Sequence, residues 1–397
     1  MEQISALIAS LSESETLAMS QRSNELKAKG VDVINLSLGE PDFFTPKHIK
    51  DAAKKAIDDN FSFYTPVPGY LSLREAICKK LQRENNLEYK PNQIICSNGA
   101  KQAVCNSLLA VVEAGSEVII PAPCWVSYIE IVKLTRGIPV VIRTTIEQDF
   151  KITPQQLEEA ITDKTRAIIL CSPSNPTGSI YSKEELEGLA KVLEKHPNIV
   201  IISDEIYEHI NYIGKHQSIA QFPYLQNRTV IVNGVSKAYA MTGWRLGWMA
   251  APLWIVKAAS KLQGQYTSCC SSIAQKAAEA AYIGDNSCVE NMRKVFERRR
   301  DLIVEWASQV KGFKINKPQG AFYLFPECSY YLGTAYNGRK IETSTDLAMY
   351  LLEEGHVACV GGDAFNSPHN IRFSYATSDE NIIEAMKRVK VALDKLK

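Results

Sequence analysis

The sequence predicts an α/β fold, in which a mostly parallel sheet is covered by helices. Between residues 92 and 250, short runs rich in β-branched residues alternate with longer stretches of helical periodicity. This alternation is typical of parallel sheets, because each helix carries the chain back to the start of the next strand. After about residue 285, long charged helical stretches surround a few short strands instead. The final third is therefore expected to form a smaller α+β unit.

Each element follows from its own pattern. We expect strands over residues 93–97, 117–121, 138–143, 167–171, 198–205, 229–234 and 245–252, with helices over 100–115, 125–137 and 182–196. In the final third, helices over 287–309 and 344–355 surround strands over 320–325, 357–360 and 370–376. Thr45 before Pro46 is expected to cap one helix, and Ser182 with Glu185 forms a capping box for another. The run ERRRD over 297–301 predicts a solvated helix face with ion pairs.

Composition and charge exclude several classes of partner. Lys and Arg number 45 and Asp and Glu 44, so no global field would attract nucleic acid or an anionic membrane. The apolar run from Trp248 to Val256 contains Pro252 and is far shorter than the ~20 residues that span a bilayer. The acidic N-terminal stretch lacks a secretion signal, and ten scattered cysteines lack metal-ligand spacing. We expect a cytoplasmic protein with reduced thiols and no metal.

A lysine follows one of the predicted strands, where open α/β sheets bind their ligands. Lys237 comes after the apolar run 229–232 and Ser236, and Arg245 lies eight residues further on. A buried lysine near another cation has a lowered pKa, and its neutral amine can form a Schiff base. A lone lysine would more often be a surface residue of a loop. The neighbouring GWR sequence over 243–245 favours the chemical role, with Ser236 and Arg245 as phosphate ligands.

A carboxylate ends another predicted strand. Asp204 follows an apolar run, and a buried carboxylate needs a cationic partner. A protonated pyridine nitrogen is one such partner, and the pair would keep the ring positive as an electron sink. Tyr207, three residues later, could offer its phenol to a ring oxygen. A helix N-cap explains Asp204 equally well when that residue is taken alone.

Two turns complete the set of polar strand ends. The turn CSPSNPTG holds Asn175 before a proline, so that its amide could donate to a phenolate, although turn chemistry alone would also explain the sequence. In SNGAKQA, a strand meets a helix start. There the backbone N–H groups of Gly99, Ala100 and Lys101 could bind a phosphate.

The order of these segments resembles that of the class I and II aminotransferases of pyridoxal phosphate (PLP) fold type I. The similarity runs from NLSLGEPDF, over residues 35–43, to NIRFSYAT, over 370–377. Within this family the chain is most similar to the bacterial aspartate aminotransferases that use a lysine for the distal carboxylate. The resemblance implies a seven-stranded sheet sandwiched by helices in a large domain, residues 46–285. Residues 286–397 would form the small domain, joined by the N-terminal segment 1–45.

The resemblance also implies roles for the residues that bind the cofactor. Lys237 would carry PLP covalently and move a proton between the substrate and the cofactor, and Asp204 would pair with the pyridine nitrogen. Tyr207 and Asn175 would bond the ring oxygen, and Trp125 would stack on the ring. The phosphate would be held by Gly99, Ala100, Lys101, Ser236 and Arg245, and by Tyr64 from the neighbouring subunit of a homodimer.

Substrate recognition is implied in the same way. Arg372 in NIRFS would bind the α-carboxylate in bidentate fashion, close to Gly39, Asn175 and Trp125. Most arginines on strands form salt bridges at a sheet's rim. Only the NIRFS motif favours carboxylate binding by Arg372. Lys101, helped by Ser14 and Thr16, would bind the distal carboxylate. A solvated residue in the first helical turn is the alternative for Lys101.

These roles predict a ping-pong aminotransferase that moves the amino group of L-aspartate to 2-oxoglutarate, giving oxaloacetate and L-glutamate. Within the family, the alternative is an aminotransferase for prephenate, aromatic amino acids or kynurenine, or, less favoured, a β-lyase. A different class is a PLP-binding effector domain of a transcription regulator. Such regulators carry a DNA-binding region ahead of the PLP domain, whereas about 30 residues precede NLSLGEPDF here.

Overall fold

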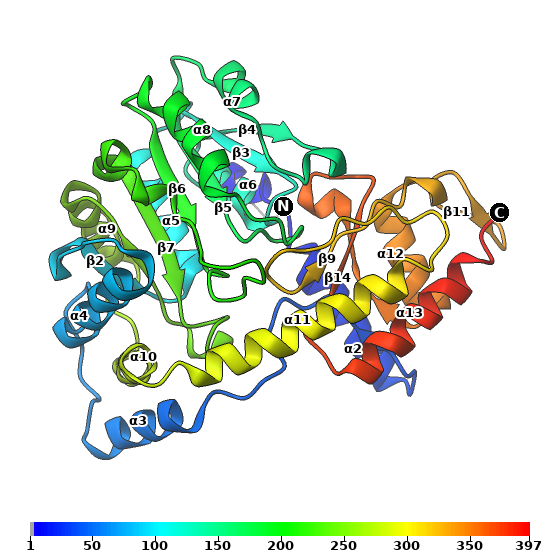
Figure 1. Cartoon of the computed structure of the whole chain (residues 1–397), viewed down its shortest axis with the longest axis horizontal. Coiled ribbons are helices and arrows are strands. Elements are labelled where there is room, and N and C mark those ends of the chain that lie inside the picture. The colour runs from blue at the N-terminus through cyan, green and yellow to red at the C-terminus, as the bar shows by residue number, and fades with distance from the viewer. Residues whose placement is uncertain (1–3) are drawn as a thin grey trace.

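The central element of the computed structural model, which describes residues 4–397, is a seven-stranded sheet with helices on both faces (Figure 1). The strand order is β2-β8-β7-β6-β5-β3-β4. Only β8 runs antiparallel to its neighbours, and the other pairs are parallel. The strands are β2 (Ile94–Ser97), β3 (Glu117–Ala122), β4 (Ile138–Arg143), β5 (Thr165–Cys171), β6 (Val200–Asp204), β7 (Thr229–Gly234) and β8 (Gly247–Ala250). The predicted α/β class is confirmed.

Alternating side chains of the central strands fill two separate cores. In β3, Val118 and Ile120 pack into one core and Ile119 into the other, as the two-residue period of a strand requires. One face is covered by α5 (Ala100–Val111), α6 (Ser127–Leu134) and α9 (Leu253–Tyr266). The other face is covered by α7 (Pro154–Ala160) and α8 (Lys183–Glu194). The predicted capping box of α8 is confirmed, because Ser182 and Glu185 bond each other's backbone N–H groups.

A third core lies where the sheet ends at β2. Here α4 (Leu71–Lys80) and α10 (Ser272–Ile283) pack together, and α3 (Lys47–Asp58) lies against α10. The cap predicted for α3 is wrong. Thr45 makes no cap bond, because its hydroxyl donates to the Ala240 carbonyl at 2.8 Å and accepts from the Trp244 indole at 3.0 Å.

The C-terminal third forms a second layered unit around its own core. It contains α11 (Ser287–Ala307), α12 (Ser344–Glu354), α13 (Asp379–Leu393) and the short strands β9 (Tyr323–Leu324), β13 (Val360–Gly361) and β14 (Ile371–Ser374). The N-terminal segment joins it, because β1 (Ile34–Asn35) pairs with β12 (Val357–Ala358) and α2 (Glu15–Ala28) packs nearby. A small hairpin links β10 (Ala335–Tyr336) to β11 (Arg339–Lys340). The domain boundaries at residues 45 and 285 stay predictions.

Two expectations for this unit need correction. The segment 357–360 is not one strand: β12 and β13 pair with different partners, β1 and β14. The ERRRD run forms ion pairs as predicted, but only Arg298 and Asp301 of this run are solvent-exposed. Arg299 and Arg300 are buried and find partners there. Arg299 donates to both oxygens of Asp42, at 2.7 and 2.9 Å, and Arg300 donates to the Pro318 carbonyl at 2.9 Å.

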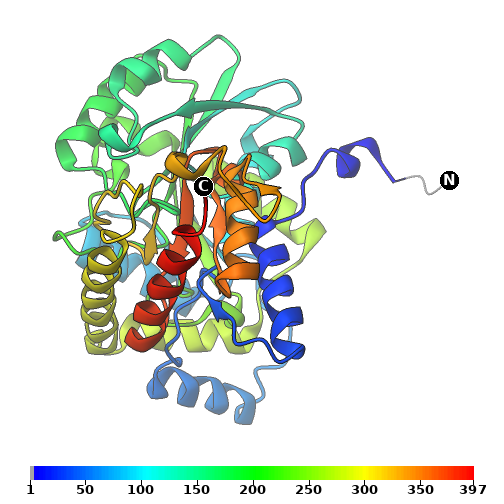
Figure 2. The same cartoon turned by 90° about the vertical axis from the view of Figure 1, so that its right-hand side faces the viewer.

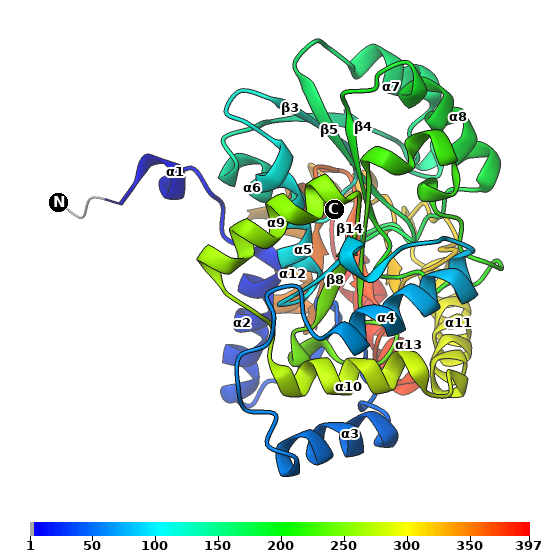
Figure 3. The same cartoon turned by 90° about the vertical axis from the view of Figure 1, so that its left-hand side faces the viewer.

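The N-terminal segment leaves the body of the molecule. Figures 2 and 3 show the stretch around α1 (Ala6–Ala9) projecting outward, with Ile4 and Ile8 largely exposed. One hydrogen bond near its base, from the Ser12 backbone N–H to Glu130 at 2.9 Å, ties it to α6. Among residues 4–397, no helix combines the length and the apolar character needed to cross a membrane.

Candidate active site

The site is a cavity of about 670 Å³ at the carboxyl ends of β5, β6 and β7, closed on the other side by the small unit and the N-terminal segment. Of the residues singled out in the sequence, those that line it are Ser14, Thr16, Gly39, Ala100, Lys101, Trp125, Asn175, Asp204, Tyr207, Ser236, Lys237, Arg245 and Arg372. Gly99 lies directly behind this lining, against Arg245. Tyr64 lies outside it, with 92 % of its surface exposed.

Asp204 lies buried at the end of β6. Its carboxylate accepts hydrogen bonds from the Tyr128 hydroxyl, at 2.6 Å, and from the Ile206 backbone N–H, at 3.3 Å. Burial raises the pKa of Asp204 to about 6, and the Tyr128 hydrogen bond opposes that rise. A carboxylate in this position would be stabilised by a cation placed against it.

Lys237 reaches into the cavity from the segment after β7. Its ammonium group donates to the Gly39 carbonyl and lies 5.6 Å from the centre of the Tyr207 ring. Burial lowers the pKa of Lys237 to about 8, with Arg372 and Arg245 adding to the effect. A substantial fraction of the amine is therefore neutral near physiological pH, as the sequence pattern predicts.

The start of α5 offers backbone donors beside a guanidinium. Gly99 is the N-cap residue, so no side chain caps this helix, and Ala100 and Lys101 line the cavity at its positive end. A Cβ on Gly99 would lie 2.3 Å from the Arg245 guanidinium, so only glycine permits this approach. Arg245 donates to the Asn98 carbonyl at 3.2 Å. The combination has the chemistry of an anion site.

Arg372 lies on β14, is only 2 % exposed and faces the large sheet. Its guanidinium donates to Asn175 Oδ1 at 2.9 Å and to the Ser37 carbonyl at 2.6 Å, while the rings of Tyr323 and Phe365 flank it. The Nε atom is buried without a protein partner among the described residues. Because Asn175 accepts through its oxygen, its amide nitrogen is left to donate into the cavity.

Lys101 lines the same cavity from α5, although its side chain stays in contact with solvent. Its ammonium group lies 5.0 Å from the centre of the Trp125 ring, and partial burial together with Arg245 lowers its pKa. Ser14 and Thr16, at the start of α2, line the same cavity. The cavity thus contains another basic side chain and two hydroxyl groups, at Lys101, Ser14 and Thr16, besides Arg372, Arg245 and Lys237.

The cavity lining also includes Tyr128, Tyr323 and Cys171, which the sequence did not single out. Tyr323 bonds the Tyr207 hydroxyl at 2.7 Å, and Tyr128 bonds Asp204, but neither stands in a polar strand-end motif. Cys171 lines the cavity because the β5–β6 register pairs it with Asp204.

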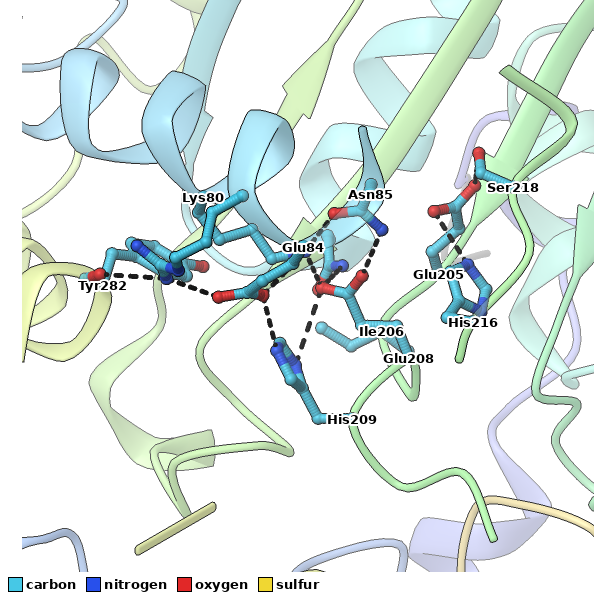
Figure 4. A network of polar contacts seen from close by, with 12 residues as sticks. Lys80, Glu84, Asn85, Glu205, Ile206, Glu208, His209, His216, Ser218 and Tyr282 are labelled. Atoms are coloured by element: carbon cyan, nitrogen blue, oxygen red, sulfur yellow. Dashed lines mark hydrogen bonds and ion pairs between the residues drawn. The ribbon is translucent and has the colours of Figure 1, made fainter. Parts of the chain in front are cut away.

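A buried ion-pair network supports the segment that carries Asp204 and Tyr207. Figure 4 shows Lys80 between Glu84, Asn85 and Glu208, with His209 beside Glu84. Burial by itself would raise the pKa of Glu208, but Lys80 and the two nearby histidines outweigh it and hold the pKa well below its usual value. Carboxylates and imidazoles cluster here as in metal sites, but Lys80 already supplies the cation.

Lys80→Ala is expected to lower the free energy of unfolding by about 3–5 kcal/mol, because Glu208 would stay buried without its cation. Denaturant unfolding followed by tryptophan fluorescence measures the change. Lys79→Ala, at the exposed neighbouring position of α4, is the matched control and should change stability little. Equal effects of the two variants would contradict the role given to the Lys80–Glu208 pair.

Comparisons with known proteins agree with one another. The family model "Aminotransferase class I and II" matches residues 31–389. A Petunia hybrida protein named bifunctional aspartate aminotransferase and glutamate/aspartate-prephenate aminotransferase is 46 % identical over 99 % of this chain and 83 % of its own. The aspartate aminotransferase structure from Rhizobium meliloti is 43 % identical, with a TM-score of 0.96 over the whole of both chains. The aspartate aminotransferase structure from Thermus thermophilus with maleate is 38 % identical, with a TM-score of 0.93. The match covers 99 % of this chain and 100 % of that one.

Proposed function

Since the chain belongs to the class I and II aminotransferase family, it is a transaminase, and we propose that it moves the amino group of L-aspartate to 2-oxoglutarate by a ping-pong reaction. The observation that carries the proposal is the pair of cations in one cavity, Arg372 on β14 and Lys101 on α5. Aspartate and 2-oxoglutarate each carry two carboxylates, so each matches this pair. The maleate in the Thermus thermophilus structure is likewise a dicarboxylate.

The residues present fit pyridoxal 5′-phosphate as the cofactor. The uncapped start of α5 with Arg245 and Ser236 suits its phosphate, and the buried carboxylate of Asp204 suits a protonated ring nitrogen. Lys237 offers an amine with a lowered pKa for covalent attachment. The amide nitrogen of Asn175 and the hydroxyl of Tyr207 would bond the ring oxygen, and Trp125 would stack on the ring.

Bound pyridoxal phosphate supplies an electron sink for the electrons of the Cα–H bond. We infer that Arg372 binds the α-carboxylate and thereby fixes the orientation of the amino acid. With the cofactor bound, the neutral amine of Lys237 would take the Cα proton and would deliver a proton to C4′ of the cofactor. Asp204 keeps the ring nitrogen protonated, and Lys101 with Ser14 and Thr16 fixes the distal carboxylate.

We propose a homodimer with shared active sites, in which Tyr64 reaches the phosphate bound by the partner subunit. Tyr64 is 92 % exposed and the adjacent Phe63 is also largely exposed, which is unusual for aromatic side chains in a monomer. The outward stretch around α1, with its exposed isoleucines, offers further apolar surface to a second copy.

We propose that the protein works in the cytoplasm. All ten cysteines are unpaired, and thiols in this state are typical of reducing compartments. Five of them are buried, and burial raises the pKa of Cys124, for example, to about 12.

Prephenate is the second candidate substrate, because the Petunia hybrida relative is named for both activities. Prephenate also carries two carboxylates, so the same pair of cations would suit it. A purely aromatic amino acid has one carboxylate and would leave Lys101 without a partner. Lys101 therefore separates dicarboxylate from aromatic specificity.

Lys101→Ala is expected to lower kcat/KM for L-aspartate by about 10–100-fold, since a hydrogen bond to a charged group contributes about 1.5–3 kcal/mol. The value for L-phenylalanine should change by no more than about twofold, because that substrate makes no ion pair at this end. Steady-state rates with both amino donors and 2-oxoglutarate measure the difference.

Lys183→Ala is the matched control, because Lys183 is an exposed lysine in the first turn of another helix, α8. It should leave both substrates unaffected. Equal losses for aspartate and phenylalanine in Lys101→Ala would remove Lys101 from substrate recognition and leave its alternative, a solvated first-turn residue.

A further inference from the structure

Tyr128 is a fully buried tyrosine that touches the most important carboxylate of the site. It lies on α6, is 2 % exposed, and its hydroxyl donates to Asp204 Oδ2 at 2.6 Å. Its ring meets that of Trp125 edge to face at 5.3 Å between centroids. Tyr128 is therefore fixed by the aromatic ring that lines the cavity and in turn fixes one oxygen of Asp204.

The other groups around Asp204 do not duplicate this hydrogen bond. Cys171, its neighbour on β5, has a pKa raised by burial to about 12 and stays a neutral thiol. Glu205 follows directly in the chain and adds negative charge, which raises the pKa of Asp204, while Lys237 lowers it more weakly than Tyr128 does. The Ile206 backbone N–H bonds only the second oxygen, at 3.3 Å.

We propose, on the basis of the proposed function, that Tyr128 is a positioning residue that keeps the Asp204 carboxylate ionised and aimed at the ring nitrogen of the cofactor. Burial raises the pKa of Tyr128 itself well above its usual value, so the hydroxyl remains a donor throughout the working pH range. Without that donor, the pKa of Asp204 would rise above about 6 and approach neutrality. A protonated Asp204 cannot pair with a positive ring nitrogen.

The test is Tyr128→Phe in the cofactor-loaded enzyme, a change that removes one oxygen atom and keeps the ring. We expect kcat with L-aspartate to fall about tenfold or more, because the lost bond is made to a charged group. KM should stay within about twofold, since Arg372 and Lys101 are untouched. The cofactor should dissociate about tenfold faster on dialysis, and the acidic limb of the kcat profile should move to higher pH, because Asp204 would be protonated at higher pH.

Tyr350→Phe is the matched control. Tyr350 is also buried, and its hydroxyl donates to the Ala392 carbonyl at 2.7 Å, inside the small unit and away from the cavity. This variant should lose some thermal stability but keep the wild-type kcat, cofactor retention and pH profile. A Tyr128→Phe enzyme that differs from wild type only in thermal midpoint, as the control does, would show a purely structural role and overturn the inference.

Two different results distinguish a failure of the proposed function from a failure of the role given to Tyr128. If the wild-type protein binds no pyridoxal phosphate or transfers no amino group, the proposed function fails. If the wild type transaminates and Tyr128→Phe retains its kcat, cofactor retention and pH profile, only the inference about Tyr128 fails.

Discussion

Lys237→Ala is expected to abolish amino-group transfer, with kcat falling by at least about 10⁴-fold, the upper range for loss of a positioned proton-transfer group. Two functions are lost together, because the same amine attaches the cofactor and moves the Cα proton. The remaining cavity residues keep their contacts, so the variant should still bind pyridoxal phosphate without a covalent bond. Steady-state rates and the absorption spectrum of the loaded protein measure the two effects separately.

The matched control is Lys257→Ala, an exposed lysine on α9 that makes no contact with the cavity. It should have wild-type kcat. A Lys237→Ala enzyme with wild-type kcat would refute the assignment.

In the wild type, covalent attachment of the cofactor to the apoprotein should become faster between about pH 7 and 9, because the pKa of Lys237 is about 8 and only the neutral amine reacts.

Arg372→Ala is expected to lower kcat/KM for every amino donor by about 10²–10⁴-fold, since two hydrogen bonds to a carboxylate contribute about 1.5–3 kcal/mol each. The loss should be of similar size for aspartate and phenylalanine, because both carry the α-carboxylate. This common loss distinguishes Arg372 from Lys101. Measurements with the same two donors in both variants provide the comparison.

Arg372→Lys keeps the charge but removes the planar fork, and we expect it to recover only part of the lost kcat/KM. Arg298→Ala is the control, because Arg298 is 63 % exposed and pairs with Asp379 on the surface. If Arg372→Ala lowered kcat/KM for aspartate but not for phenylalanine, Arg372 would bind the distal carboxylate and not the α-carboxylate.

Most cavity residues could be predicted because they follow strands of one parallel sheet. Asn175 and Lys237 follow β5 and β7, and Asp204 ends β6, which lies between these strands in the sheet, so the three side chains meet at one edge. That conclusion needs only the alternation of strands and helices. The resemblance to a family then assigned a chemical role to each position.

Contacts between elements far apart in the chain could not be predicted in this way. Tyr128 reaches Asp204 from a helix 76 residues earlier, and Tyr323 reaches Tyr207 from a different sheet. The packing of α6 and β9 decides both contacts, and no local pattern reports it. Thr45 failed as a cap for the same reason, because a distant carbonyl and an indole compete for its hydroxyl.

The charged run on α11 shows a further limit of sequence reasoning. Acidic residues on both sides of the three arginines predict a solvated face, yet Arg299 is only 7 % exposed and lies between Asp42 and the rings of Phe43 and Phe296. Its partner comes from the segment before α3, some 257 residues away. Ion pairs can be predicted from neighbouring charges, but burial depends on which distant segment covers them.

The most direct test of the account is a single half-reaction. Purified protein loaded with pyridoxal phosphate is mixed with L-aspartate and no keto acid, then separately with L-phenylalanine, and the cofactor's absorption band is followed. The account predicts rapid, complete conversion to the aminated cofactor with aspartate and much slower conversion with phenylalanine. Conversion with phenylalanine alone would contradict the dicarboxylate specificity, and the absence of any cofactor band would contradict the whole assignment of Lys237.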